Sequence, residues 1–145
     1  MKIFLTSMVL ACAALSLGQS VATKATGPSS AKVGKPFTVK VMIKIPSGYH
    51  IYGHTEKAGI PTAIEVAGGK GVASKVNYPA TSKFNSLDGP VNVYVNEVTI
   101  PVTVTLPKTS KGKQTLKLKV TTQACNDRTC LPPKTDTLSV AVDVH

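Results

Sequence analysis

The sequence contains little arginine and few aromatic residues. Aromatic side chains make up 5% of the 145 residues, tryptophan is absent, and Arg128 is the single arginine among 17 basic residues. Proteins that read nucleic acids rely on arginine for bidentate base contacts and on aromatic rings for stacking. The formal net charge of +10 therefore does not point to nucleic acid as a partner. Two interpretations of the lysines stay open: solvated strand faces, or attraction to an acidic partner or an anionic membrane surface.

Common catalytic and cofactor motifs are also missing. The sequence has no Gly-x-Ser-x-Gly elbow, no glycine-rich phosphate loop and no carboxylate pair at a suggestive spacing. His50 and His54 lie four residues apart, but in a strand and loop context rather than on the helix that a zinc protease requires. A blue-copper centre needs two histidines with its cysteine, and only His145 follows the last two cysteines. We therefore expect no small-molecule cofactor, with a metal site as a minor alternative.

A long hydrophobic run occurs only at the N-terminus. After a short basic start, residues 3–17 are almost all apolar, and Ser20-Val21-Ala22 offers small residues where a signal peptidase reads the chain. The run is too short and too weakly flanked for a good membrane span. We predict a signal peptide over residues 1–22 and one exported domain over residues 23–145. Lipid anchoring at Cys12 is less favoured, because the apolar run continues past that cysteine.

Beyond the N-terminus, the sequence consists of short alternations of apolar and polar residues between turn residues. The alternation is clearest at 35–45, 115–121 and 137–144, where lysine or threonine separates valine, leucine and isoleucine. A period of two buries one face of a strand and leaves the other in water. Weaker strand candidates are 49–53, 62–66, 72–77, 91–95 and 98–106.

No segment shows a sustained helical period, and glycine and proline mark the joints between the strand candidates. Seven or eight short strands in about 120 residues predict an all-β fold, an immunoglobulin-like antiparallel β-sandwich. Residues 23–35 are rich in serine, threonine and glycine, and we expect them to form a loose segment ahead of the first strand.

Two cysteines remain after removal of the predicted signal peptide, Cys125 and Cys130. They flank a polar turn and can meet across it, in an exported setting where disulfides persist. A disulfide closing a loop of about six residues stabilises by roughly 2 kcal/mol, against nearly 5 kcal/mol for about a hundred residues. A redox role, a structural staple and metal binding all remain open on spacing alone. Arg128 and Lys134 would favour a reactive thiolate, whereas Asp127 would oppose it.

The cysteine segment resembles a known family. Gln123-Ala124-Cys125, followed by a polar gap, Cys130 and Pro132-Pro133, is similar to the active-site hairpin of the N-terminal domain of the bacterial thiol:disulfide interchange protein DsbD. Supporting similarities are Gly48-Tyr49-His50-Ile51-Tyr52 with Gly59-Ile60-Pro61-Thr62, and Tyr94 with Val98-Thr99-Ile100-Pro101-Val102. The resemblance covers about residues 32–144 and implies an immunoglobulin-like fold in the periplasm.

The resemblance also implies roles for individual residues. In that family the second cysteine forms mixed disulfides with partners and the first resolves them, which makes Cys130 the attacking sulfur and Cys125 the resolving one. A cap loop shields the pair. Its counterpart here is residues 82–89, with Phe84 or Leu87 as the apolar lid, and tyrosines near the site correspond to Tyr49 or Tyr52. These supporting residues are Phe84, Leu87, Tyr49 and Tyr52.

The resemblance implies an electron-transfer function and its partners. Electrons would pass from a membrane thiol carrier, DsbD or a CcdA-like protein, to oxidised periplasmic thiol proteins, as in a protein-disulfide reductase. The family's multi-helix membrane domain and thioredoxin-like domain are not in this sequence, so we expect a separate membrane partner. The cap counterpart carries Asn85, Ser86 and Asp88 instead of an adjacent acidic pair. The alternative function is a non-catalytic binding module whose disulfide only pins a hairpin.

Overall fold

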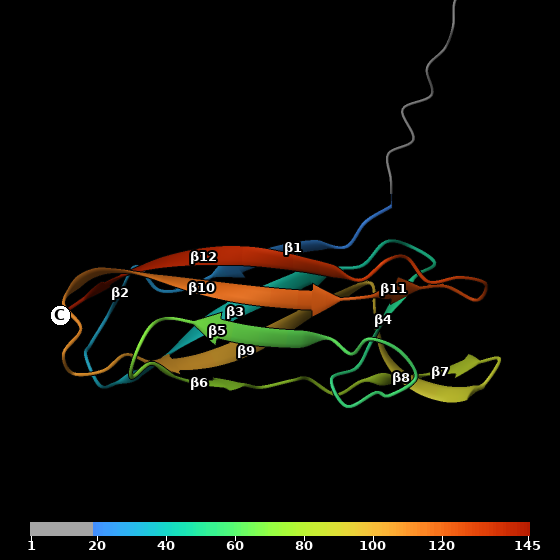
Figure 1. The fold of residues 1–145 in the computed structure, drawn as a ribbon, viewed down its shortest axis with the longest axis horizontal. Coiled ribbons are helices and arrows are strands. Elements are labelled where there is room, and N and C mark those ends of the chain that lie inside the picture. Colours follow the sequence, from blue (N-terminus) through green and yellow to red (C-terminus); the bar gives the residue numbers. More distant parts are fainter. Residues whose placement is uncertain (1–18) are drawn as a thin grey trace, which may run out of the picture.

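The computed structural model describes residues 19–145, which form twelve strands in three sheets and contain no helix capable of crossing a membrane (Figure 1). The strands are β1 (Ala22–Thr26), β2 (Ser30–Ala31), β3 (Pro36–Lys44), β4 (His50–Tyr52), β5 (Ala63–Ala67), β6 (Ala73–Val76), β7 (Ser82–Ser86), β8 (Gly89–Val95), β9 (Glu97–Thr105), β10 (Gly112–Thr122), β11 (Ala124–Cys125) and β12 (Lys134–Val144). The prediction of an all-β, immunoglobulin-like antiparallel β-sandwich is confirmed.

Two four-stranded sheets form the sandwich, with strand orders β1-β3-β9-β6 and β2-β12-β10-β5. The alternating segments behave as their period predicts, because β3 buries every second side chain and exposes lysine, threonine or methionine between them. The core residues that are fully buried on both sheets are Val39, Val41, Ile43, Ile100, Val102, Val104, Leu118, Val120 and Val142. The sandwich thus supplies a rigid body behind the site.

A third sheet, ordered β11-β4-β8-β7, extends the sandwich at the end opposite the C-terminus (Figure 1). Two sandwich strands are directly continuous with it: β9 follows β8 after Asn96, which has a φ of 61°, and β11 follows β10 after Gln123. A non-glycine residue at positive φ breaks the regular pleat and redirects the chain. This third sheet carries Cys125, which pairs with Cys130 across the following turn, and the break at Gln123 makes β11 a separate strand from β10.

Two predicted loops are strands. Residues 23–35, expected to be loose, contain most of β1, which pairs with β3, and β2, which pairs in parallel with β12. Residues 82–89, expected to be a cap loop, contain β7 and the turn into β8. Neither segment has the alternating large apolar residues that mark a strand, but each meets a sheet edge whose backbone groups need partners. The cap counterpart is therefore the tip of a β-hairpin.

The predicted signal peptide and the lipid-anchoring site at Cys12 lie almost wholly outside the described residues, which begin at Gln19. The boundary after Ala22 remains a prediction. Val21 is 4% exposed and packs in the main core, and its carbonyl oxygen accepts a hydrogen bond from Lys134 Nζ at 2.9 Å. Ala22 begins β1. A cut after Ala22 would therefore remove a core side chain and the first residue of a paired strand.

Candidate redox site

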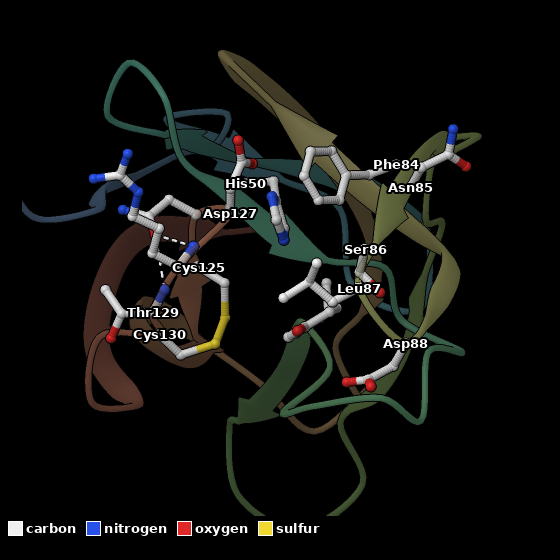
Figure 2. Close-up of a pocket in the computed structure, with 13 residues that line it drawn as sticks. His50, Phe84, Asn85, Ser86, Leu87, Asp88, Cys125, Asp127, Thr129 and Cys130 are labelled. Atoms are coloured by element: carbon white, nitrogen blue, oxygen red, sulfur yellow. Dashed lines mark hydrogen bonds between the residues drawn. A yellow bond between two sulfur atoms is a disulfide. The ribbon is translucent and has the colours of Figure 1, made fainter.

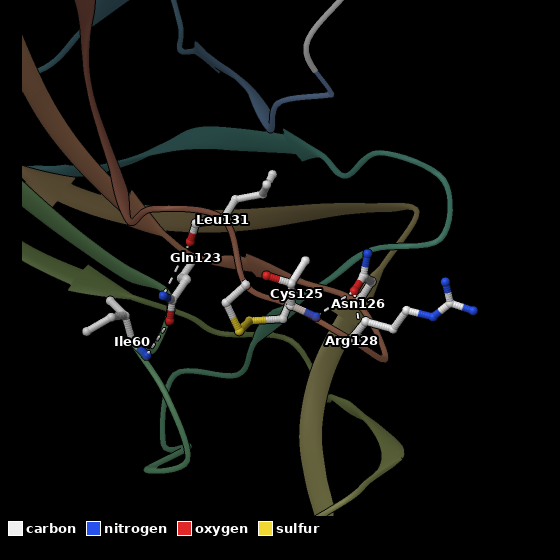
Figure 3. The surroundings of a disulfide bond; sticks show 8 residues. Ile60, Gln123, Cys125, Asn126, Arg128 and Leu131 are labelled. Atoms are coloured by element: carbon white, nitrogen blue, oxygen red, sulfur yellow. Dashed lines mark hydrogen bonds between the residues drawn. A yellow bond between two sulfur atoms is a disulfide. The ribbon is translucent and has the colours of Figure 1, made fainter.

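Cys125 and Cys130 form a disulfide at the tip of the hairpin between β11 and β12, with their Cα atoms 4.0 Å apart. Asn126 shapes the intervening turn. Its side-chain Oδ1 accepts hydrogen bonds from the backbone N–H groups of Arg128, at 2.9 Å, and Thr129, at 2.8 Å (Figure 3). Asparagine favours such turns because its short side chain can satisfy backbone donors two and three residues on. The local sequence thus brings the two cysteines together.

The two sulfur-bearing residues differ in exposure. Cys125 is 1% exposed and packs in a small apolar cluster with Tyr52, Val91 and Val93. Cys130 lies on the exposed side of the hairpin. Because thiol–disulfide exchange needs a clear approach to one sulfur, an incoming thiolate can reach Cys130 far more readily than Cys125.

A cavity of about 510 Å³ opens beside the disulfide (Figure 2). The cysteine hairpin forms one wall, and the turn between β7 and β8 forms the other. The lining residues are His50, Tyr52, Phe84, Asn85, Ser86, Leu87, Asp88, Cys125, Asn126, Asp127, Arg128, Thr129 and Cys130. The cavity therefore combines apolar side chains, charged groups and the disulfide in one open space.

The apolar part of this cavity is an aromatic wall. The His50 ring lies 4.3 Å from the Phe84 ring and 5.8 Å from the Tyr52 ring, measured between centroids. His50 is 4% exposed, and burial lowers its pKa below the usual 6.5, while the negative charge of Asp127 acts in the opposite direction. Burial therefore favours the uncharged form of its imidazole.

Hydrogen bonds connect the segment between β4 and β5 to the cysteine hairpin and to β8. Gln123 Oε1 accepts from the Ile60 N–H at 3.1 Å, and its Nε2 donates to the Leu131 carbonyl at 3.4 Å (Figure 3). Glu56 Oε2 accepts from the backbone N–H of Asn92, at 2.8 Å, and from its side chain. Hydrogen bonds from the backbone of Asn92 and Lys57 lower the pKa of Glu56 to about 2. These bonds tie the segment both to the cysteine hairpin and to β8.

The structure separates the four residues predicted to support the site. Tyr52 and Phe84 line the cavity and pack in or against the cluster that contains Cys125. Leu87 lines the cavity rim but is 96% exposed, so it does not cover the disulfide. Tyr49 packs against the main core instead. The period of two explains this difference, because His50 and Tyr52 share one strand face and the intervening Ile51 is buried in the sandwich core.

Sequence reasoning missed three residues and misjudged a fourth. His50 was considered only as a metal ligand beside His54, yet His54 stacks on Tyr78 at 3.8 Å and does not line the cavity. The shared face of His50 and Tyr52 was the available signal. Asn126 and Gln123 gave no such signal, since their roles depend on hydrogen-bond partners. Lys134 pairs with Asp136 at 3.2 Å and does not line the cavity, contrary to its predicted support of a thiolate.

Within residues 19–145, no three side chains of histidine, cysteine, aspartate or glutamate gather as a metal site would require. The groups that converge on the cavity are instead the two sulfurs, one imidazole and the charged turn residues Asp127, Arg128 and Asp88. This arrangement allows the Cys125–Cys130 bond to open and close by exchange with an incoming sulfur.

Comparison with known proteins agrees with this geometry. The profile of the family described as "Thiol:disulfide interchange protein DsbD, N-terminal" matches residues 19–142. No curated protein sequence matches the chain. The N-terminal periplasmic domain of ScsB from Proteus mirabilis is similar in structure, with a TM-score of 0.64 at 16% identity over 82% of this chain and 45% of that chain. This chain thus spans less than half the length of that structure.

A glycoside hydrolase of family 123 from Clostridium perfringens gives a weaker likeness, with a TM-score of 0.43 at 9% identity over 85% of this chain and 27% of that chain. The likeness to ScsB supports the sandwich fold. The family profile spans nearly all the described residues, including the cysteine hairpin and the β7–β8 turn. The chain belongs to the family of DsbD N-terminal domains.

Proposed function

We propose that this protein is an exported thiol–disulfide exchange module that passes electrons from a membrane thiol carrier to oxidised periplasmic proteins through Cys125 and Cys130. The observation that carries the proposal is the difference between the two sulfurs. Cys130 is exposed beside an open cavity, whereas Cys125 is 1% exposed and within bonding distance of it. A disulfide placed only for stability would gain more by joining distant strands than by closing this short hairpin.

The exchange proceeds in two displacements when the pair is reduced. The Cys130 thiolate attacks a disulfide of the substrate protein, which forms a mixed disulfide and releases one substrate thiolate. Cys125 then attacks Cys130, so that the intramolecular disulfide forms and the second substrate thiolate leaves. The substrate gains two electrons and the module loses them. A membrane thiol carrier, DsbD or a CcdA-like protein, restores the dithiol by the reverse sequence.

Of the two residues predicted as the apolar lid, Phe84 and Leu87, Phe84 has this role in the proposal. Phe84 shields the buried side of the disulfide, since it packs against the cluster that contains Cys125. Leu87, at the tip of the β7–β8 turn, offers an exposed apolar contact for a docking protein. Tyr52 completes the wall behind Cys125. Tyr49 contributes only to the core.

The periplasmic location rests on the family and on the predicted signal peptide. The solved ScsB domain is a periplasmic domain, and the family profile describes an interchange protein. The proposed organisation is a signal peptide over residues 1–22 followed by one domain over residues 23–145. A periplasm maintained in an oxidising state supplies the oxidised proteins that such a module would reduce.

Trapping tests both the function and the roles. A Cys125→Ser variant should accumulate mixed disulfides through Cys130 in a periplasmic extract, while Cys130→Ser, which leaves only the buried sulfur, should accumulate few. Equal trapping by both variants would contradict the assigned roles. Redox titration of the wild type tests the alternative of a structural staple, whose reduction potential would lie below about −300 mV.

A further inference from the structure

His50 stands directly opposite Cys125 in the third sheet. The two residues are partners in the antiparallel register of β4 and β11. The side chains of such partners lie on the same face, with Cβ atoms about 4.5–5.5 Å apart. Both side chains line the same cavity, and Figure 2 shows the imidazole of His50 directed into it beside Phe84. His50 is therefore held beside Cys125 on the wall of this cavity.

The buried position of Cys125 creates a chemical difficulty for its proposed role. To resolve a mixed disulfide it must attack as a thiolate, but removal from water favours the protonated thiol. Cys125 is 1% exposed and its neighbours Tyr52, Val91 and Val93 offer no positive charge. The resolving step therefore needs a nearby group that accepts the proton.

Few groups around the cavity can accept that proton. The titratable or charged residues that line it, besides the cysteines and His50, are Tyr52, Asp88, Asp127 and Arg128. Asp88, Asp127 and Arg128 lie exposed in the two turns, and Tyr52 offers a hydroxyl group rather than a basic nitrogen. His50 combines a position opposite Cys125 with an imidazole whose uncharged form burial favours, and the unprotonated ring nitrogen of that form can accept a proton.

We propose that His50 accepts the proton of the Cys125 thiol as Cys125 attacks the mixed disulfide on Cys130. The bond from Cys125 Sγ to Cys130 Sγ forms while the bond from Cys130 to the substrate sulfur breaks. The leaving substrate thiolate takes up the proton that His50 received, so the imidazole ends neutral. The proposal rests on the exchange function above and adds to it a base for the second displacement.

The test follows both displacements in one reaction. The reduced protein is mixed with 5,5′-dithiobis(2-nitrobenzoic acid), and the absorbance of released thionitrobenzoate is followed by stopped flow. Attack by Cys130 releases the first equivalent, and resolution by Cys125 releases the second. His50→Phe keeps an aromatic ring against Phe84 and Tyr52 but removes the base, and His50→Gln serves if that variant does not fold. The matched control is His54→Phe, since His54 is exposed and lies outside the cavity.

The expected result is a second phase at least about a hundredfold slower at neutral pH in the His50 variants, at the lower end of the range for loss of a general base. The first phase, and both phases of His54→Phe, stay at the wild-type rate. In the His50 variants the second phase should rise about tenfold for each pH unit as the thiol itself ionises. In the wild type it should fall only at acidic pH, where His50 becomes protonated.

Other outcomes would overturn the assignment. A second phase as fast in His50→Phe as in His54→Phe would show that His50 is not the base. Equal slowing of both phases would indicate a structural effect on the hairpin and would also refute the proposal. A wild-type protein that releases no thionitrobenzoate would refute the exchange function itself, and the role of His50 with it.

Discussion

Replacement of Asn126 by alanine should make the disulfide easier to reduce. The Asn126 side chain accepts two hydrogen bonds, from the N–H groups of Arg128 and Thr129, and these bonds hold the turn that brings the cysteines together. The backbone bond from the Asn126 N–H to the Thr129 carbonyl, at 2.9 Å, does not depend on the side chain and stays. The variant therefore keeps the hairpin but loses the restraint from the side chain.

The size of the effect follows from these two bonds. Each net hydrogen bond contributes about 0.5–1 kcal/mol here, because the freed N–H groups are at the surface and can bind water. If the turn loosens only when the disulfide opens, the oxidised form loses about 1–2 kcal/mol relative to the reduced form. For a two-electron couple, about 30 mV corresponds to 1.4 kcal/mol, so the reduction potential should rise by about 20–40 mV.

The assay is redox titration in glutathione or dithiothreitol buffers, with alkylation of free thiols and mass spectrometry to count them. The matched control is Asn85→Ala, because Asn85 also lines the cavity but lies on β7, away from the cysteine turn. The control should keep the wild-type potential. An unchanged or more negative potential in Asn126→Ala would show that the turn does not favour the closed disulfide.

Three further predictions concern the N-terminus, the β4–β5 segment and the cap. A chain starting at Thr23 should be less stable than one starting at Gln19 by about 1.5–3 kcal/mol, since it lacks the buried Val21 side chain. Urea denaturation measures this difference, and equal unfolding midpoints for the two chains would mean that Val21 does not stabilise the core. The stability difference between the wild type and Glu56→Gln should be largest above about pH 4.5 and should shrink as the pH falls towards about 2. The reason is that the Glu56 carboxylate, whose pKa its hydrogen bonds lower to about 2, stabilises the fold only while it is ionised. Urea midpoints at several pH values measure this, and a pH-independent difference would contradict it. Phe84→Ala should speed reduction of the disulfide by dithiothreitol, because Phe84 packs against the cluster that contains Cys125. The matched variant Leu87→Ala should keep the wild-type rate, since the exposed Leu87 side chain does not cover the disulfide. Identical rates in the two variants would show that Phe84 does not shield the disulfide.

Local patterns determined much of the architecture. The alternation in β3, β10 and β12 identifies strands with one buried face, because a period of two is a property of the chain itself and needs no knowledge of neighbours. The spacing of Cys125 and Cys130 across a polar turn likewise contains the information needed to bring them together, since the turn is local. These three strands and the proximity of the two cysteines could therefore be predicted from the sequence.

Tertiary structure alone decided which groups meet at the sulfurs. β1 and β7 carry weak strand patterns and became strands because sheet edges offered them backbone partners. The burial of Cys125 and the exposure of Cys130 depend on the pairing of β11 with β4. That pairing also sets His50 opposite Cys125 and directs Tyr49 to the core. Such relations join residues far apart in sequence, and the register between strands, which no local pattern encodes, fixes them.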